Sequence, residues 1–201
     1  MAKGECVLVA LHYQNENCHP DGKIRIGLAA DAEDWRRDVM AAAGRLLAGA
    51  RQHGVPLVHV RYAMHAGHAN LVPNAPIFRQ IIDQDAWVEG TWGTEFIAGL
   101  EPVADEIVVS HSRMSGFHGS QLAEVLAHWR PRQLVIAGVS TTYVVEATAR
   151  HAVDVGYEVS VAHDACATGS RQAHEASLAA MELLCEIRSV DEIVEGWAGE
   201  N

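Results

Sequence analysis

Short apolar runs recur along the chain and alternate with longer segments in which apolar residues are spaced three or four positions apart. A short run rich in Val, Leu or Ile that is ended by polar residues is typical of a buried parallel strand. Such runs predict strands at 5–12, 55–62, 105–111, 132–138 and 157–164, with a short strand and a closing turn at 186–194. Helical spacing predicts helices at 32–54, 119–130, 141–156 and 170–185, and an amphipathic piece at 77–82 in a less regular stretch.

Two residues support the ends of these predicted helices. Gly54 follows the first helix and can act as its stop. Ser120 lies near the start of the second helix, where a serine hydroxyl can cap the backbone N–H groups.

The regular alternation of strands and helices predicts the α/β fold class, as a three-layer α/β/α arrangement with a central parallel sheet. No internal repeat or linker interrupts the pattern, so we expect one domain over residues 1–201. In such sheets, ligands bind beyond the carboxyl ends of the strands. The site is therefore expected in the segments that follow the strands, at 12–15, 62–68, 111–119, 138–144 and 164–168.

Composition narrows the class of partner. The chain has 201 residues, of which 49% are hydrophobic, enough for one full-sized core. The formal net charge is -11 and no Lys/Arg block occurs, which argues against nucleic acid and anionic membranes as partners. No apolar run reaches membrane-spanning length, and no signal-peptide pattern is present. The four cysteines form no CxxC pair, so we expect a cytoplasmic protein with reduced thiols.

Polar side chains stand at the predicted strand ends. His12 is followed by Gln14, and His111 by Arg113, while Ser140 follows the fourth strand. Histidine changes charge near neutral pH, so a crevice lined by such residues could carry out general acid–base chemistry on a small molecule. The alternative is that these residues are simply solvated.

Six segments, in this order, carry a resemblance to a known family: "LVALHYQNENCHPDG", "GVPLVHVRY", "VEGTWGTEF", "HSRMSGFHGSQL", "VIAGVSTTYVVEATARHA" and "DACATGSRQAHEASL". Together they resemble the isochorismatase-like family, which includes the nicotinamidase-type cysteine hydrolases. The resemblance covers nearly the whole chain and implies the fold predicted above. It also implies a homo-oligomer that binds a small-molecule substrate.

All three working residues of that family are replaced in this chain. The resemblance puts His12 at the position of the family's Asp, His111 at that of its Lys and Val144 at that of its Cys. Valine cannot attack a carbonyl, so the family's covalent thioester route is excluded. Cys18 and Cys166 match family positions that are not the nucleophile.

The turn that should hold the nucleophile keeps its frame. By resemblance, a cis peptide bond joins Val139 and Ser140, and the N–H groups of the turn form an oxyanion hole. Two adjacent imidazoles in place of Asp and Lys should push their pKa values apart, leaving one neutral base and one acid. His12 and His111 are therefore the predicted catalytic residues.

Three hypotheses remain open. The first is an enzyme whose acid–base chemistry has been rebuilt on the histidine pair, acting on a small, anionic or cyclic metabolite by a hydrolase, lyase or isomerase reaction. The second is a catalytically silent subunit for ligand binding or assembly. A pocket collapsed around Val144 would support this hypothesis. The third is a metal-dependent hydrolase using His65 and His68, although the metal-binding Asp of some relatives falls on Tyr62 here and no cofactor is expected.

Further residues are expected around the substrate. Arg113 could hold an anion, His118 could reach the mouth of the pocket, and Trp87 and Trp92 could wall the pocket or a subunit interface. The predicted substrate-binding set is Gln14, Trp92, Arg113, Phe117, His118, Ser140, Thr141 and Val144.

Overall fold

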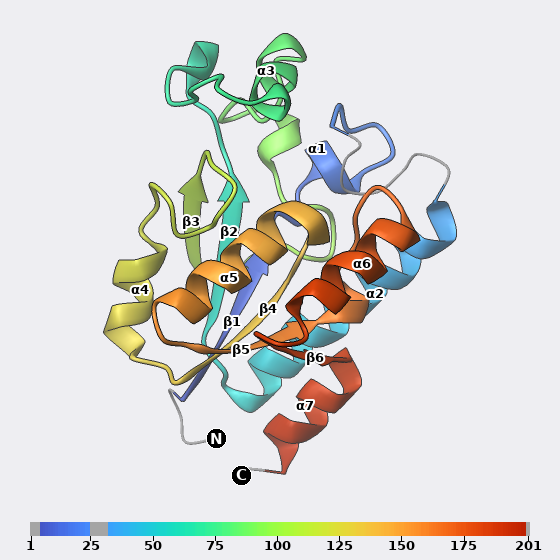
Figure 1. Cartoon of the computed structure of the whole chain (residues 1–201), viewed down its shortest axis with the longest axis vertical. Coiled ribbons are helices and arrows are strands. Elements are labelled where there is room, and N and C mark those ends of the chain that lie inside the picture. Colours follow the sequence, from blue (N-terminus) through green and yellow to red (C-terminus); the bar gives the residue numbers. More distant parts are fainter. Residues whose placement is uncertain (1–4, 25–31, 200–201) are drawn as a thin grey trace.

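A parallel sheet of six strands forms the centre of the part of the chain that the structure describes (Figure 1). The structure is a computed structural model, and it describes residues 5–24 and 32–199. The strand order is β3-β2-β1-β4-β5-β6, and every neighbouring pair is parallel. The strands are β1 (Cys6–Leu11), β2 (Leu57–Tyr62), β3 (Ile107–His111), β4 (Gln133–Gly138), β5 (Glu158–Ala162) and β6 (Glu186–Arg188).

Helices cover the sheet, and the predicted α/β class is confirmed. Figure 1 shows α5 across the front of the sheet and α2 behind it. The strands can be nearly continuous apolar runs because both faces are covered, and every residue of β1 is buried. The helices are α1 (Asn15–Cys18), α2 (Glu33–His53), α3 (Pro76–Asp83), α4 (Leu122–Trp129), α5 (Glu146–Asp154), α6 (Arg171–Met181) and α7 (Val190–Ala198).

The structure corrects the prediction at the end of the chain. The segment expected as a closing turn is the helix α7. Ser189 and Glu192 form a capping box, in which each side chain binds the other residue's backbone N–H. The Ser-x-x-Glu spacing of this box was present in the sequence and marks the start of the helix.

Two helix starts also differ from the prediction. α4 begins at Leu122 rather than at residue 119. Ser120 lies next to the cap residue Gln121, as predicted, and its hydroxyl accepts a hydrogen bond from the Leu122 N–H and donates one to the Gly116 carbonyl. The helix expected from residue 141 begins with a π-turn at Thr141–Val145 before α5 continues. The predicted stop at Gly54 is confirmed, since Gly54 caps α2 in the left-handed conformation.

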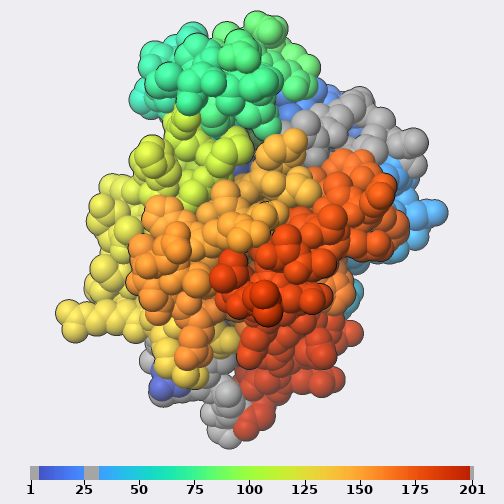
Figure 2. Space-filling view, viewed as in Figure 1, coloured from blue at the N-terminus to red at the C-terminus, as the bar shows by residue number. Residues whose placement is uncertain are grey.

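The segment between β2 and β3 builds a second, smaller apolar cluster. Figure 2 shows this segment, in teal and green, as a cap at the top of the molecule, and Figure 1 places α3 within it. Its buried side chains are Ile24, Tyr62, Met64, Leu71, Phe78, Ile81, Ala86 and Trp87. The cap lies beyond the carboxyl ends of the strands and therefore covers the edge where a ligand is expected.

Packing of α7 against α2 can be tested at two glycines of α2. A Cβ atom on Gly49 would lie 2.6 Å from Val194 Cγ2, whereas one on Gly44 would meet only Leu100 Cδ2, at 3.8 Å. Gly44→Ala should raise the free energy of unfolding by roughly 0.5–1 kcal/mol, because alanine is the better helix former. Gly49→Ala should lower it by about 1 kcal/mol, because the overlap with Val194 outweighs that gain.

Urea unfolding followed by circular dichroism measures both variants. An equal rise in stability for Gly44→Ala and Gly49→Ala would show that α7 does not dock closely on α2.

Candidate active site

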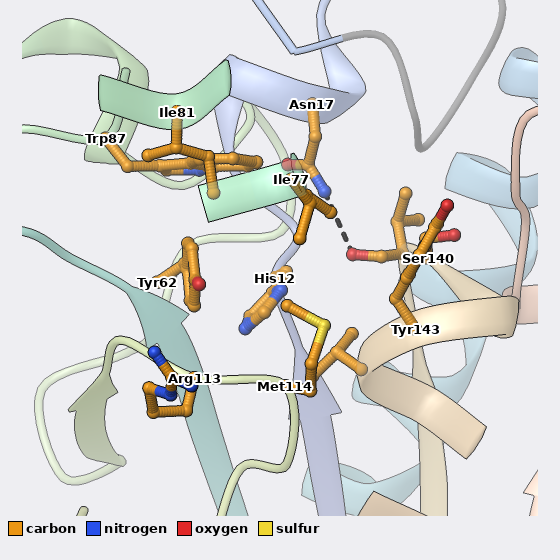
Figure 3. Close-up of a pocket in the computed structure, with 12 residues that line it drawn as sticks. His12, Asn17, Tyr62, Ile77, Ile81, Trp87, Arg113, Met114, Ser140 and Tyr143 are labelled. Carbon is orange, nitrogen blue, oxygen red and sulfur yellow. Dashed lines mark hydrogen bonds between the residues drawn. The ribbon is translucent and has the colours of Figure 1, made fainter. Parts of the chain in front are cut away.

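A small cavity lies beyond the carboxyl ends of β1, β2 and β4 (Figure 3). Its volume is about 30 Å³, which leaves room for about two water molecules. We call it the inner cavity, and it is lined by His12, Asn17, Tyr62, Ile77, Ile81, Trp87, Arg113, Met114, Val139, Ser140, Tyr143 and Val144.

The parallel register aligns the strand ends around this cavity. Leu11 pairs with Gly138, so the residues that follow β1 and β4 emerge together. Tyr62 pairs with His111, so the ends of β2 and β3 are also level. His12 has φ 55°, in the left-handed region, where its carbonyl accepts the Gln14 N–H at 2.8 Å. This turn ends β1 and leads the chain into α1.

His12 and His111 meet side chain to side chain. Their Nε2 atoms are 2.5 Å apart and their ring centroids 4.8 Å apart, although the residues are 99 positions apart in the sequence. Two nitrogen lone pairs at this distance would repel, so one proton must lie between them. The two side chains are nearly buried, with 7% of His12 and 3% of His111 exposed.

Burial keeps both imidazoles neutral. It lowers the pKa of His12 well below 6.5, and the charge of His111 lowers that pKa further. Burial also lowers the pKa of His111 to about 4, against a small opposing effect of the Ser115 backbone and with a smaller contribution from His118. Desolvation thus disfavours the charged form of both rings. The pairing of one base with one acid stays a prediction.

The turn after β4 has the expected backbone and no nucleophile. The peptide bond between Val139 and Ser140 is cis, as the resemblance implied. The Val144 side chain is 2% exposed and lines the inner cavity. The Asn17 amide donates to the Val139 carbonyl at 2.9 Å. Figure 3 shows Asn17 on the same side of the cavity as Ser140.

The hydroxyls of this turn are engaged with each other and with neighbours. Ser140 Oγ lies 2.5 Å from Thr168 Oγ1, which is also 2.7 Å from Thr142 Oγ1. Thr141 is fully buried, and its Oγ1 lies 2.9 Å from His174 Nδ1. Ser140 therefore borders the inner cavity, whereas Thr141 supports the turn from behind.

Two predicted substrate-binding residues hold the framework. The Gln14 side chain is fully buried: it accepts the Tyr62 N–H and donates to the Tyr62 and Thr94 carbonyls. Phe117 stacks on His151, with ring centroids 4.7 Å apart. Neither residue lines the inner cavity.

The remaining predicted residues divide between the cavity and the surface. Arg113 lines the inner cavity, as expected. Trp92 is 45% exposed and makes an edge contact with His19, while Trp87 is the tryptophan that walls the cavity. His118 is exposed and lines a second, larger depression.

That depression, which we call the outer cleft, has a volume of about 630 Å³. His111 lines it and not the inner cavity, so the histidine pair separates the two spaces. The residues that line the outer cleft are Ala63, His65, Asn70, Val72, Glu89, Ser110, His111, Ser112, Arg113, His118 and Gly119.

Several lining residues were missed from the sequence. Two of them, Ile77 and Ile81, come from α3 in the cap. The others are Asn17 from α1, Met114 from the loop after β3 and Tyr143 from the π-turn. Ile77 and Ile81 are one turn apart on the amphipathic α3, and this spacing predicted a helix but not the surface that its apolar face covers.

The two histidines considered as metal ligands are not assembled into a site. His65 is exposed, and the buried His68 places Nε2 3.0 Å from the Ala86 carbonyl, to which it must donate. Within residues 5–24 and 32–199, no group of three or more His, Cys, Asp or Glu side chains is arranged to hold a metal ion.

The described helices include none with the length and apolar character needed to cross a membrane.

Comparison with known proteins identifies relatives. The family description "Isochorismatase domain" matches residues 6–192. The chain is 28% identical over 161 residues to the uncharacterized isochorismatase family protein YecD of Escherichia coli O157:H7, covering 78% of this chain and 82% of that protein. It is 31% identical over 144 residues to maleamate amidohydrolase of Pseudomonas putida, covering 70% of this chain and 64% of the relative.

A solved structure has the same fold. The cysteine hydrolase of Pseudomonas syringae pv. phaseolicola superposes with a TM-score of 0.89 at 18% identity, covering 100% of this chain and 96% of that chain.

The burial of the histidine pair predicts a pH-dependent stability. As the pH falls below 6.5, unfolded imidazoles take up protons, whereas folded His111 does not bind one until about pH 4 and the pKa of folded His12 also lies well below 6.5. Because the unfolded state then binds more protons, the free energy of unfolding should fall across this window. In His111→Gln, this fall between pH 6.5 and pH 4 should be smaller by about 2 kcal/mol.

Urea unfolding at a series of pH values measures the effect. His128→Gln, at an exposed position of α4, is the matched control and should keep the wild-type slope. An unchanged slope in His111→Gln would show that the pair is not desolvated.

Proposed function

This chain belongs to the isochorismatase family, and we propose that it is a hydrolase that acts on a small metabolite without a cysteine nucleophile. The observation that carries the proposal is the contact between His12 Nε2 and His111 Nε2, 2.5 Å apart at the edge of the inner cavity. By the sequence resemblance, the pair stands at the positions of the family's acid and cation. Val144, which lines the cavity, would stand at the third position and offers no nucleophile.

The pair acts as a general base and then as a general acid. His12 borders the inner cavity, and both imidazoles are neutral at pH 7, so the pair can accept a proton. It takes this proton from a water molecule as the water oxygen bonds to the substrate carbon. The pair returns the proton to the leaving group when the bond to that group breaks, so the enzyme ends the cycle unchanged.

Hydrolysis of an amide is the favoured reaction. The relative from Pseudomonas putida is named for an amidohydrolase activity, and an amide nitrogen needs the proton that the pair returns. Hydrolysis of an enol ether or of a ring, or a lyase or isomerase step, would use the same proton transfers. Val139 and Ser140 line the cavity, and the Val139 N–H already donates to the Leu11 carbonyl at 3.1 Å. We therefore expect the Ser140 N–H to bind the substrate's oxygen.

A small-molecule substrate suits a hydrolase of this family. Assembly as a homo-oligomer and a cytoplasmic location stay predictions.

A second candidate is a catalytically silent subunit that binds a ligand or supports assembly. The observation that favours it is the size of the inner cavity, about 30 Å³, with Val144 and other apolar side chains in its wall. A site that has lost its reaction can shrink in this way, because no substrate has to fit.

The proposed hydrolase predicts activity that depends on the pair and not on a thiol. Ammonia release from a panel of small amides should fall by roughly 10²-fold or more in His12→Gln and in His111→Gln, because each change removes one partner of the proton transfer. Val144→Ala should retain activity. No ammonia release by the wild type, or full activity in both histidine variants, would contradict the hydrolase.

Iodoacetamide should leave the activity of the wild type unchanged. All four cysteines are buried, and burial raises the pKa of Cys18 and of Cys166 to about 12, so their thiolates are scarce at neutral pH. Inactivation in step with alkylation of one cysteine, followed by mass spectrometry, would instead point to a thiol mechanism.

The silent subunit predicts a different result. Wild type should then release no ammonia, and the triple variant H12D/H111K/V144C should gain activity, because the turn and the strand ends that frame the family's residues are retained. Turnover by the wild type excludes this candidate.

A further inference from the structure

The wall of the inner cavity is almost free of charge. Most of its lining side chains are apolar or aromatic, and His12 is neutral at pH 7 because burial lowers its pKa. Of the described residues that line it, Arg113 is the one with a permanent positive charge. A bound carboxylate would therefore have to be neutralised by Arg113 or stay unpaired.

Arg113 is already engaged with the cap. Its Nη1 donates to the Val72 carbonyl at 3.1 Å and its Nη2 to Asn74 Oδ1 at 3.0 Å. The face of its guanidinium lies 4.1 Å from the centre of the Phe78 ring. Figure 3 shows Arg113 at the margin of the site, on the opposite side of His12 from Ser140. These contacts direct its donors toward the segment around Val72 and hold the cap in place.

The neighbouring charges also oppose an anion. His111 has no positive charge at neutral pH, because burial lowers its pKa to about 4. Glu16 is buried, and its carboxylate accepts the backbone N–H of Trp87 at 3.0 Å and the backbone N–H of Lys23 at 2.8 Å. Gly93 leaves space for this carboxylate, since a Cβ there would lie 2.1 Å from Glu16 Oε2. Because Trp87 also lines the inner cavity, the negative charge of Glu16 disfavours an anion beside Trp87.

One donor in the wall lacks an acceptor. Trp87 is 3% exposed, and its Nε1–H finds no hydrogen-bond partner among the described residues. A buried donor without an acceptor is destabilising, and a ligand oxygen would relieve that cost. The indole meets Tyr62 edge to face, with ring centroids 5.1 Å apart. Tyr62 in turn lies 5.1 Å from the His12 ring, so Tyr62 stands between the indole and the histidine pair.

Taking the inner cavity as the substrate site, and so resting on the proposed function, we propose that the substrate is a small uncharged molecule with a carbonyl oxygen, such as a neutral amide. The apolar side chains pack its hydrocarbon part, and Trp87 Nε1 donates to an oxygen. A carboxylate of the same shape is rejected, because none of the described residues that line the cavity offers a free cation to replace its hydration. The small volume restricts the ligand to a few heavy atoms, with room gained by movement of Met114 and the half-exposed Tyr143.

Two probes of matched shape test the charge preference. Butanamide carries a methyl group where succinamate carries a carboxylate, and both have the same amide end. Titration of ¹³C-methyl-labelled protein, with the Met114 signal assigned from Met114→Leu, reports occupancy of the cavity directly, independently of ammonia release. Butanamide should shift the Met114, Ile77 and Ile81 methyl signals. It should bind at least about tenfold more tightly than succinamate.

The opposite order of affinities, or equal affinities, overturns the inference, and so does the absence of any shift with butanamide. Trp87→Phe keeps the ring and removes the donor, and it should weaken butanamide binding.

Variants of the basic residues separate the role of Arg113 from that of its neighbours. Arg113→Gln should leave the preference for butanamide in place, because Arg113 holds the cap and not the ligand. Arg61→Gln is the matched control, since Arg61 binds Ser110 and Glu89 away from the inner cavity. Selective loss of succinamate binding in Arg113→Gln would show instead that Arg113 is the anion site.

A cation placed at the family's lysine position should reverse the preference. His111→Lys is expected to strengthen succinamate binding about tenfold, provided that circular dichroism shows the wild-type fold. Failure here is distinguishable from failure of the proposed function, because these measurements report binding whether or not an amide is cleaved.

Discussion

Parallel pairing of β1 with both β2 and β4 is the constraint on which the site depends. The pairing sets the ends of these strands level, so that His12, Tyr62 and Val139 emerge around one space. The Gln14 side chain strengthens this alignment by bonding the Tyr62 backbone on both sides. Because the alignment is made by backbone hydrogen bonds, it does not depend on which side chains then carry out chemistry. The three family positions could therefore change while the frame around them persisted.

The resemblance implies that two histidines replace an Asp and a Lys, and such a replacement would change the electrostatics of the site. An ion pair places two opposite charges in a buried space and needs both of them. A pair of imidazoles can be buried without any charge, because one shared proton satisfies both Nε2 atoms. Desolvation then lowers both pKa values. The result is a site whose histidine pair carries no positive charge at neutral pH, and this one property underlies both the proposed mechanism and the proposed substrate class.

The cap closes this neutral site from above. Its buried aromatic and aliphatic side chains form their own cluster, so the cap is held by packing as well as by Arg113. Arg113 lines both the inner cavity and the outer cleft, and its hydrogen bonds run to the cap. An arginine that looks like an anion site in the sequence thus has a structural task in the folded protein.

The sequence by itself determined most of the fold. Apolar runs located all six strands, and the motif resemblance located the cis peptide bond. The replacement of the family's three working residues stays a prediction. It misassigned α7 although the Ser189 and Glu192 capping signal was present, and it could not tell that Thr141 faces away from the cavity. Tertiary structure alone decided that His12 touches His111, that both rings stay neutral and that α3 supplies the roof. The physical reason is that strand and helix patterns are local, whereas desolvation and hydrogen-bond partners come from residues far away in the chain.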